Sequence, residues 1–395
     1  MRVITDTADL AAHCEAYAHA AFVTIDTEFM RERTYYAQLC LVQLARPEGS
    51  GGDGLDDAAI VDPMAEGIDL APLFALLAAP VVKVFHAARQ DVEIFYLLTG
   101  EIPAPLFDTQ IAAMVCGYGD QVGYETLVRR VAKADVDKSS RFTDWAHRPL
   151  SKKQLAYALA DVTHLRTVYE ALKERLESSG RAQWVAEELA TLTSKDTYEV
   201  DPDQVWRKVK ARSQSPRFLG VVQSLARWRE ITAQARNVPR SRILKDDALV
   251  EVAAARPTTA DELHKLRLLQ REGRKPEMAA EILAAVAQGM AVPEDLLPML
   301  EAPAPRKEGS AAIADLLKVF LKARADELGI ASKLLASSSD LEALAGEDAP
   351  DLPVLRGWRY ESFGRDALRI KEGRVALAVG RHGVELVERT PVEAG

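Results

Sequence analysis

Two carboxylates interrupt the most strand-like segment of this 395-residue chain. The run AFVTIDTEF, residues 21–29, has the apolar character of a buried central strand, and Asp26 and Glu28 stand two residues apart in it. Because side chains at i and i+2 point to the same face of a strand, the two acids share one face. Clustered carboxylates repel one another unless a cation lies between them. Taken alone, the segment fits either a strand with a solvated end or a buried strand that carries part of a metal site.

Two further acidic patterns follow in order. Asp91 lies in FHAARQDVEIF, near the start of a helix, and Tyr157 and Asp161 lie in LAYALADVTHL. Tyr157 and Asp161 are four residues apart in a helical pattern, so they share a helix face. Each pattern alone has an ordinary structural explanation, such as an acid favoured by the helix dipole. Together they indicate an all-oxygen site of the kind that Mg²⁺ prefers, as in a two-metal phosphodiesterase.

The order of these motifs resembles that of ribonuclease D, in the tyrosine branch of the DEDD 3′→5′ exonucleases. The resemblance extends to FDTQIAAMVCGYGDQVGYETLV, DKSSRFTDWAHRPLS and QLAYALADVTHL. A later stretch, LARWREITAQARNVPRSRILKDDALVEVAAARPTTADEL, resembles the HRDC domain, a helical module shared by helicases and ribonuclease D. The resemblance covers most of the chain. It implies an exoribonuclease that trims the 3′ ends of RNA, including tRNA precursors and other small RNAs.

The resemblance also implies roles for single residues. Two divalent cations, Mg²⁺ or Mn²⁺, are expected on the four acids Asp26, Glu28, Asp91 and Asp161. Such a pair of cations activates a water molecule and stabilises the leaving 3′-oxygen, which releases nucleoside 5′-monophosphates. Tyr157 is expected to orient the attacking water, because a phenol that titrates near pH ~10 is a poor general base.

Six further residues are candidates for substrate contact. They lie beside the acids or in the segments that carry the resemblance: Phe29, Met30, His86, Gln90, Lys138 and Arg148. Phe29 and Met30 either stack on the terminal base or pack in the core. His86 either touches the substrate or caps the helix that carries Asp91. Arg148 is expected to meet a phosphate.

The order of secondary structure predicts an α/β fold. Three consecutive strands without helices between them suggest an antiparallel meander, and later strands alternate with helices. This pattern fits a mixed sheet of the ribonuclease H-like kind, which the DEDD exonucleases share. The expected strands cover six segments: 2–4, 21–29, 39–44, 59–61, 81–85 and 106–108.

Three domains are predicted. An exonuclease domain spans residues 1–195, and two small all-helical domains of the HRDC type follow at 207–290 and 308–388. A segment rich in proline and small residues separates the last two and is typical of a linker. Helices are expected in the last domain as well, although RVALAVG, residues 374–380, also fits a strand.

The charge of the chain is unevenly distributed. Residues 207–290 contain 17 Lys and Arg against 9 Asp and Glu, a net charge of +8. Because the whole chain has a net charge of −9, the rest of it has a net charge of −17. A basic segment on an acidic protein is typical of a region that binds phosphates. A GC-rich genome, in which arginine is common, would give the same excess without any binding.

The sequence favours a cytoplasmic protein without membrane contact. No apolar run approaches the about 20 residues that cross a bilayer, and the N-terminus lacks a signal-peptide core. Cys14, Cys40 and Cys116 are odd in number and lack metal-ligand spacing, so neither a zinc site nor a disulfide framework is expected. The family resemblance implies a monomer.

Two other classes of function stay open. A DNA 3′→5′ exonuclease of the proofreading type shares the acids, and HRDC domains also occur with DNA helicases. A catalytically silent RNA-binding relative would share the fold, but such a relative would most readily lose one of the acids, and all four are present. Relative rates on matched RNA and DNA oligonucleotides distinguish the first alternative.

Overall fold

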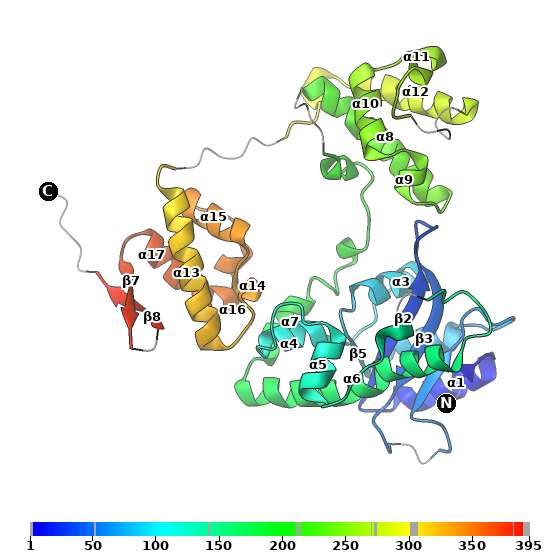
Figure 1. The fold of residues 1–395 in the computed structure, drawn as a ribbon, viewed down its shortest axis with the longest axis vertical. Coiled ribbons are helices and arrows are strands. Elements are labelled where there is room, and N and C mark those ends of the chain that lie inside the picture. The colour runs from blue at the N-terminus through cyan, green and yellow to red at the C-terminus, as the bar shows by residue number, and fades with distance from the viewer. Residues whose placement is uncertain are drawn as a thin grey trace.

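The computed structural model describes residues 3–50, 53–140, 143–210, 213, 215–269, 271, 275–300, 307–381 and 383–389. They form three lobes (Figure 1): an N-terminal α/β unit, residues 3–189, a first helical module, residues 205–291, and a second helical module, residues 310–388. No helix among the described residues is long and apolar enough to span a bilayer.

The α/β unit is built on a six-stranded mixed sheet in the order β1-β4-β3-β2-β5-β6. β2, β3 and β4 form an antiparallel meander, whereas β5 runs parallel to β2, and β6 runs parallel to β5. The predicted α/β class with a mixed sheet is confirmed, and the strand ends differ from the predicted ones by one residue at most. The strands are β1 Val3–Ile4, β2 Phe22–Met30, β3 Gln38–Ala45, β4 Ala58–Val61, β5 Val82–Phe85 and β6 Leu106–Asp108.

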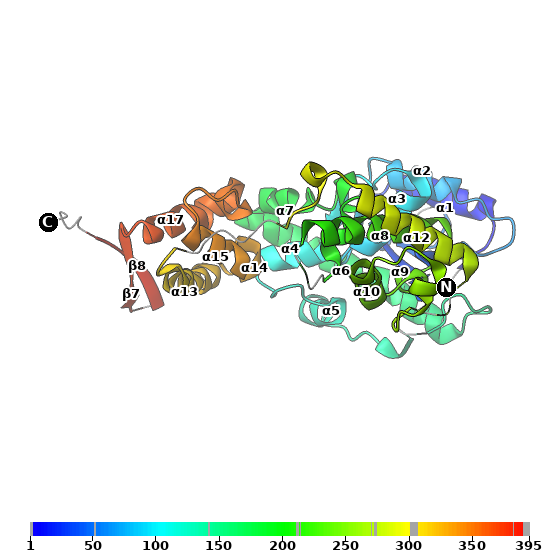
Figure 2. The ribbon, with the colours of Figure 1, turned by 90° about the horizontal axis from the view of Figure 1, so that it is seen from above.

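Helices cover both faces of the sheet. α6, Lys152–Ser179, lies across one face, and α1, Thr7–Ala18, packs with α2, Ala71–Ala78, on the other. Figure 2 shows α1 and α2 side by side at the edge of the α/β unit. The Thr24 hydroxyl on β2 donates to the carbonyl of Val162 at 2.9 Å, which fixes α6 against the centre of the sheet. The other helices of this unit are α3 Arg89–Thr99, α4 Thr109–Val115, α5 Tyr124–Val131 and α7 Ala182–Leu189.

The first helical module packs around α8, Pro216–Ala235, and α12, Pro276–Ala291. The two helices approach closely at Gly289, where a Cβ atom would lie 2.6 Å from the Cα atom of Val221, so a larger residue there would force them apart. A short 3₁₀ helix, η3, leads into the module at Val205–Lys208. The remaining helices are α9 Arg240–Ile243, α10 Asp246–Ala255 and α11 Ala260–His264.

The second helical module ends in a β-hairpin. β7, Val375–Gly380, pairs antiparallel with β8, Gly383–Glu388. The segment 374–380 is therefore a strand, the alternative noted for it, and the expectation of helices throughout this module is wrong at its end. The helices before it are α13 Ser310–Leu328, α14 Ser332–Leu335, α15 Ser338–Gly346, α16 Gly357–Arg359 and α17 Arg365–Lys371.

Candidate active site

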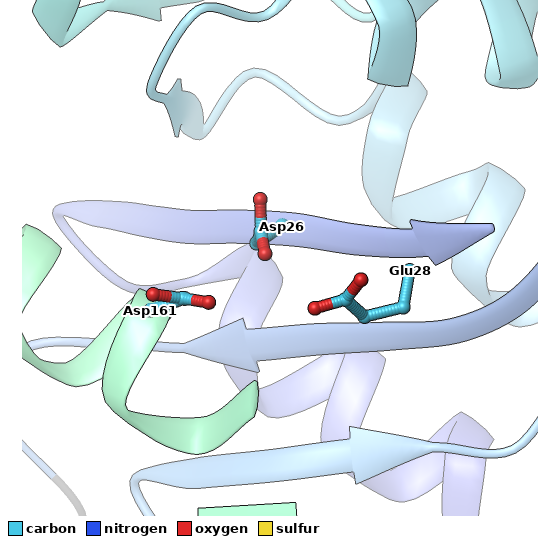
Figure 3. A group of neighbouring side chains, drawn as sticks. All are labelled: Asp26, Glu28 and Asp161. Atoms are coloured by element: carbon cyan, nitrogen blue, oxygen red, sulfur yellow. The ribbon is translucent and has the colours of Figure 1, made fainter. Parts of the chain in front are cut away.

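Three carboxylates meet where β2 leaves its neighbour β5. β2 pairs with β5 only over residues 22–24 but with β3 as far as Met30, so the acid-bearing end of β2 is open on one side. Asp26 and Glu28 lie on that end, and Asp161 faces them from α6 (Figure 3). One carboxylate oxygen from each of the three residues lies within 4.8 Å of the others. The fold therefore brings three of the four predicted acids together.

The fourth acid, Asp91, lies beside this group. It is buried in the first turn of α3, and its carboxylate accepts a hydrogen bond of 2.5 Å from the hydroxyl of Thr27, the residue between Asp26 and Glu28. Burial first, and then the charge of Asp26, raise the pKa of Asp91 well above its ordinary value. Asp91 and Asp26 are thus electrostatically coupled, although Asp91 is not one of the three acids that share the 4.8 Å cluster.

The electrostatics of the cluster suit a divalent cation. Burial, followed by the charge of Asp161, raises the pKa of Asp26 well above its ordinary value of 3.8. The same burial and repulsion that disfavour the ionised acids would be relieved by a bound positive charge. All donors at the cluster are carboxylate oxygens, which hard cations such as Mg²⁺ prefer. The residues present therefore fit a divalent metal centre.

Tyr157 lies one helical turn before Asp161 and hydrogen-bonds to it. Its ring is 6.0 Å from that of Trp145, centroid to centroid, at an interplanar angle of 31°. Burial first, and then the charges of Asp161 and Glu28, raise the pKa of Tyr157 above its ordinary value of 10. The phenol therefore stays protonated at neutral pH and can donate a hydrogen bond.

A cavity of about 620 Å³ opens over the carboxylates. Four of the six predicted substrate residues line it: Phe29, Met30, His86 and Gln90. Met30 also packs against the apolar cluster that contains Trp145, so the two roles considered for it are compatible. A ligand can reach the four acids through this cavity, because all four line it.

His86 does not cap α3. Among the described residues, no side chain caps α3; the carboxylate of Asp108 caps α4 and also accepts hydrogen bonds from the backbone N–H groups of Ala87 at 3.0 Å and Ala88 at 2.9 Å, just before α3. The Nδ1 atom of His86 lies 3.0 Å from the Thr109 hydroxyl, and the backbone carbonyl of Val122 is a further hydrogen-bond partner of the ring. Burial lowers the pKa of His86, so its ring is neutral at pH 7.

The other two predicted substrate residues, Arg148 and Lys138, are not among the described residues that line the cavity. The Arg148 guanidinium forms two hydrogen bonds of 2.7 Å with Asp62 and one of 2.8 Å with the carbonyl of Cys40. It does not line the cavity, and these partners, which its sequence context did not reveal, argue against the predicted phosphate contact. The side chain of Lys138 lies outside the described residues.

Two residues that the sequence analysis did not single out belong to the site. The hydroxyl of Tyr124 donates to the carbonyls of Ala160 and Asp161, at 3.0 and 2.7 Å, and Tyr124 lines the cavity. Thr27 holds Asp91. Thr27 stands inside the DTE motif, but its partner is far away in sequence, so no local pattern reveals the contact.

Comparisons with known proteins agree with this geometry. Residues 1–177 match the model of a 3′-5′ exonuclease family, and residues 218–286 match that of the HRDC domain. The chain is 55% identical to the ribonuclease D of Jannaschia sp. (strain CCS1) over 98% of this chain and 99% of that one. It is 48% identical to the ribonuclease D of Granulibacter bethesdensis over 98% and 96% of the two chains.

The chain belongs to the ribonuclease D family. A solved structure of Escherichia coli RNase D, described as an exoribonuclease involved in structured RNA processing, is also similar. It has 31% sequence identity and a TM-score of 0.80, and the match covers 94% of this chain and 98% of that one. The ribonuclease D fold expected from the sequence, an exonuclease domain followed by HRDC-type helices, is confirmed by these matches.

Proposed function

We propose that this ribonuclease D family member hydrolyses RNA from its 3′ end and releases nucleoside 5′-monophosphates with the help of two divalent cations. The observation that carries the proposal is the cluster of Asp26, Glu28 and Asp161 at the floor of an open cavity. Family membership at 55% identity supports the same activity.

The four acids divide the work of holding cations. Asp26, Glu28 and Asp161 form the shared oxygen cluster, and Asp91, coupled to Asp26, completes the ligand set. These acids would hold divalent cations, Mg²⁺ or Mn²⁺, which would supply a hydroxide nucleophile from water and neutralise charge on the leaving 3′-oxygen. Tyr157 orients the attacking water as a neutral donor.

The cavity walls position the last nucleotide. Phe29 and Met30 offer an apolar surface against which a base stacks irrespective of its identity. The side chains of His86 and Gln90, which line the cavity, offer polar contacts to the sugar or phosphate. The cavity is open enough for a single strand to enter by its 3′ end.

The basic segment holds the rest of the RNA. A second cavity, of about 490 Å³, lies at the entry to the first helical module. It is lined by basic side chains of Lys208, Arg229, Arg240 and Lys245 and by one acid, Asp246. We assign the exonuclease domain to residues 1–195 and RNA-binding HRDC domains to 207–290 and 308–388. The substrates are tRNA precursors and other small RNAs, and the enzyme acts as a cytoplasmic monomer.

A nuclease assay tests the proposal. Purified protein is incubated with 5′-labelled RNA, with and without EDTA, and the products are resolved by length. A ladder that shortens one nucleotide at a time, with release of 5′-monophosphates and full inhibition by EDTA, is expected. Asp26→Asn and Asp161→Asn should lower the rate by orders of magnitude, whereas the exposed Asp196→Asn serves as a control with unchanged rate. Near-normal activity of either first variant would refute the metal assignment.

Two further substitutions and substrates separate the alternatives. Tyr157→Phe removes only the hydroxyl, so it should lower the rate while RNA binding stays nearly constant. A matched DNA oligonucleotide distinguishes a ribonuclease from a proofreading-type DNA exonuclease. Lys208→Gln with Lys245→Gln should flatten the slope of log affinity against log salt. On single strands the slope should change by about 0.7 for each phosphate that the protein no longer neutralises.

A further inference from the structure

A fully buried glutamine beside the metal cluster lacks hydrogen-bond partners. Gln43 on β3 has no exposed surface, and neither its Oε1 nor its Nε2 atom has a partner among the described residues. The amide of a glutamine offers two donor hydrogens and an acceptor oxygen, so its burial without partners costs free energy. A native fold retains such a buried polar group when a partner outside the protein chain, such as a water molecule or an ion, or a functional role accounts for it.

Gln43 faces the metal cluster. In the antiparallel pair of β2 and β3, Gln43 lies directly opposite Asp26. Directly opposite residues of such a pair place their side chains on the same face, with Cβ atoms about 4.5–5.5 Å apart. Thr24, two residues before Asp26 and therefore on the same face, bonds to α6. The amide of Gln43 thus lies beneath α6, between Asp26 and its other cross-strand neighbour, Ile60.

The surroundings of Gln43 leave few polar partners. Ile60 belongs to an apolar cluster with Leu41, Trp145 and Ala158, which covers this part of the α6 face. Thr24 already donates to the carbonyls of Ala45 and Val162. Asp26 is the polar residue that the sheet register places opposite the amide.

We propose that Gln43 is a positioning residue for Asp26: its Nε2–H group donates to the ionised Asp26 carboxylate, directly or through one buried water, and orients it toward the cation. The inference rests on the proposed function, because it requires a cation on Asp26. Hydrogen-bond partners of metal ligands fix the orientation of those ligands, and their loss typically weakens metal binding about 10–100-fold.

This role makes an unusual pair of predictions for Gln43→Leu. The variant keeps a similar volume and removes the unpartnered amide, so the metal-free protein should melt at an unchanged or higher temperature in EDTA. Its affinity for Mn²⁺, measured directly by titration calorimetry, should fall about 10–100-fold. An amide that served only the packing of the sheet would leave Mn²⁺ affinity unchanged.

Lys83→Met is the matched control. Lys83 is also fully buried in the same sheet, on β5, but its ammonium donates to the carbonyls of Ala79 and Ala104. The sheet register places it opposite Val23, so it belongs to the other end of β2 from the acids. Its replacement should lower the melting temperature of the metal-free protein and leave the Mn²⁺ affinity unchanged.

The measurements distinguish a failure of the proposed role of Gln43 from a failure of the metal site itself. If the wild-type protein binds Mn²⁺ and Gln43→Leu binds it equally well, the role of Gln43 is refuted while the metal site stands. If the wild-type protein binds no Mn²⁺, both the metal site and the role of Gln43 are refuted. A melting temperature that falls as far as in Lys83→Met, together with unchanged Mn²⁺ affinity, would show that the amide serves only the packing of the sheet, which also overturns the inference. Gln43→Met, unbranched and of the same length, replaces the leucine variant if that variant does not fold.

Discussion

The two helical modules are joined to the α/β unit in different ways. Buried side chains of the second helical module, such as Leu317 and Phe363, belong to one continuous apolar core with those of the α/β unit. The first helical module has a core of its own, around Leu225 and Ile282, and the α/β unit contributes Tyr35 to its edge. One joint is an extension of a core, and the other is a contact between two separately packed bodies.

The joint of the second helical module rests on apolar surface and backbone hydrogen bonds. Trp184 of α7 stacks on Trp358 with ring centroids 4.4 Å apart and planes at 10°. The backbone N–H of Ala331 donates to the carbonyl of Met114 in α4 at 3.0 Å. Separation of this joint would expose apolar side chains of both partners to water, which makes it strong.

The joint of the first helical module is polar. The side-chain oxygen of Asn237 accepts the backbone N–H groups of Tyr35 and Tyr36, at 3.1 and 3.0 Å. The Tyr35 hydroxyl donates to the buried carboxylate of Glu230, which also pairs with Arg240. The Arg240 guanidinium lies 5.0 Å from the centroid of the Tyr35 ring. We call these five residues the polar latch.

The contrast between the joints indicates where each module acts. The polar latch holds the loop between β2 and β3, and the same loop supplies Arg31 and Glu32 to the wall of the catalytic cavity. The first helical module therefore touches the segment that follows Glu28, one of the proposed metal ligands. The second helical module packs against α4 and α7, away from that segment (Figure 1).

The largest expected effect comes from Trp358→Ala. Because this ring belongs to the shared core, its removal should destabilise the α/β unit itself by about 3–5 kcal/mol. Calorimetry should show the transition of that unit at lower temperature. Trp206→Ala is the matched control, since Trp206 is buried in the separate core of the first helical module and should affect that module alone. An unchanged α/β transition in Trp358→Ala would remove the distinction between the joints.

A smaller effect is expected from Tyr35→Phe. The variant keeps the ring and removes the hydroxyl that donates to Glu230, so docking of the first helical module should weaken by about 1–3 kcal/mol. Small-angle scattering should then show a larger radius of gyration, while the α/β unit melts at its usual temperature. A lower melting temperature of the α/β unit would mean that the first helical module is part of the same folding unit.

Acidification should change the stability of the two joints in opposite directions. Burial raises the pKa of Glu188, which pairs with Arg359 at the second joint, above its ordinary value of 4.5, so its stabilising contribution is complete below pH 4.5 and is lost as the pH rises through the raised value. Burial also acts on Glu230, but hydrogen bonds from Arg240 and Tyr35 outweigh it and lower its pKa, so its contribution is present above pH 4.5 and is lost below.

Acidification from neutral pH should therefore first strengthen the second joint and then, below pH 4.5, loosen the first. Unfolding and scattering measured across this range test the order. Glu188→Gln should remove the upper change and Glu230→Gln the lower one, which separates both from the titration of the acids at the metal cluster. The same pH dependence in wild type and both variants would exclude these two carboxylates as its source.

The smallest effect is expected from Lys333→Ala. Lys333 pairs with Asp120 at 2.6 Å across the second joint, but its side chain is 64% exposed. Exposed ion pairs contribute about 0–1 kcal/mol, so the loss should be near the limit of detection and should vanish at high salt. A loss comparable with that of Trp358→Ala would mean that the second joint is held by charge and not by its apolar core.

The alternation of side chains along a strand and the four-residue spacing along a helix predicted much of the candidate site. The period of two along β2 placed Asp26 and Glu28 on one face, and the four-residue spacing on α6 placed Tyr157 beside Asp161. The order of strands and helices predicted the α/β fold, because the segments with a local strand pattern are the ones that pair in the sheet.

Contacts between distant segments were not foreseeable in this way. Arg148 lies in a segment that resembles the family, yet its partner Asp62 comes from the end of β4, and no local pattern announces that pair. The unpartnered amide of Gln43 is visible only once the register of β2 and β3 is known. The apolar periodicity of α13 predicts a buried face but does not say whose core it joins.

The dispersal of the acids along the chain has a consequence for biosynthesis. Asp26 and Glu28 emerge early from the ribosome, whereas Asp161 arrives only with α6, after every strand of the sheet has been made. A nascent chain that ends between β6 and Asp161 holds every strand of the sheet but cannot assemble the cluster. Hydrolytic activity therefore reports that the chain has been made and folded as far as α6, and it does not report on the two helical modules.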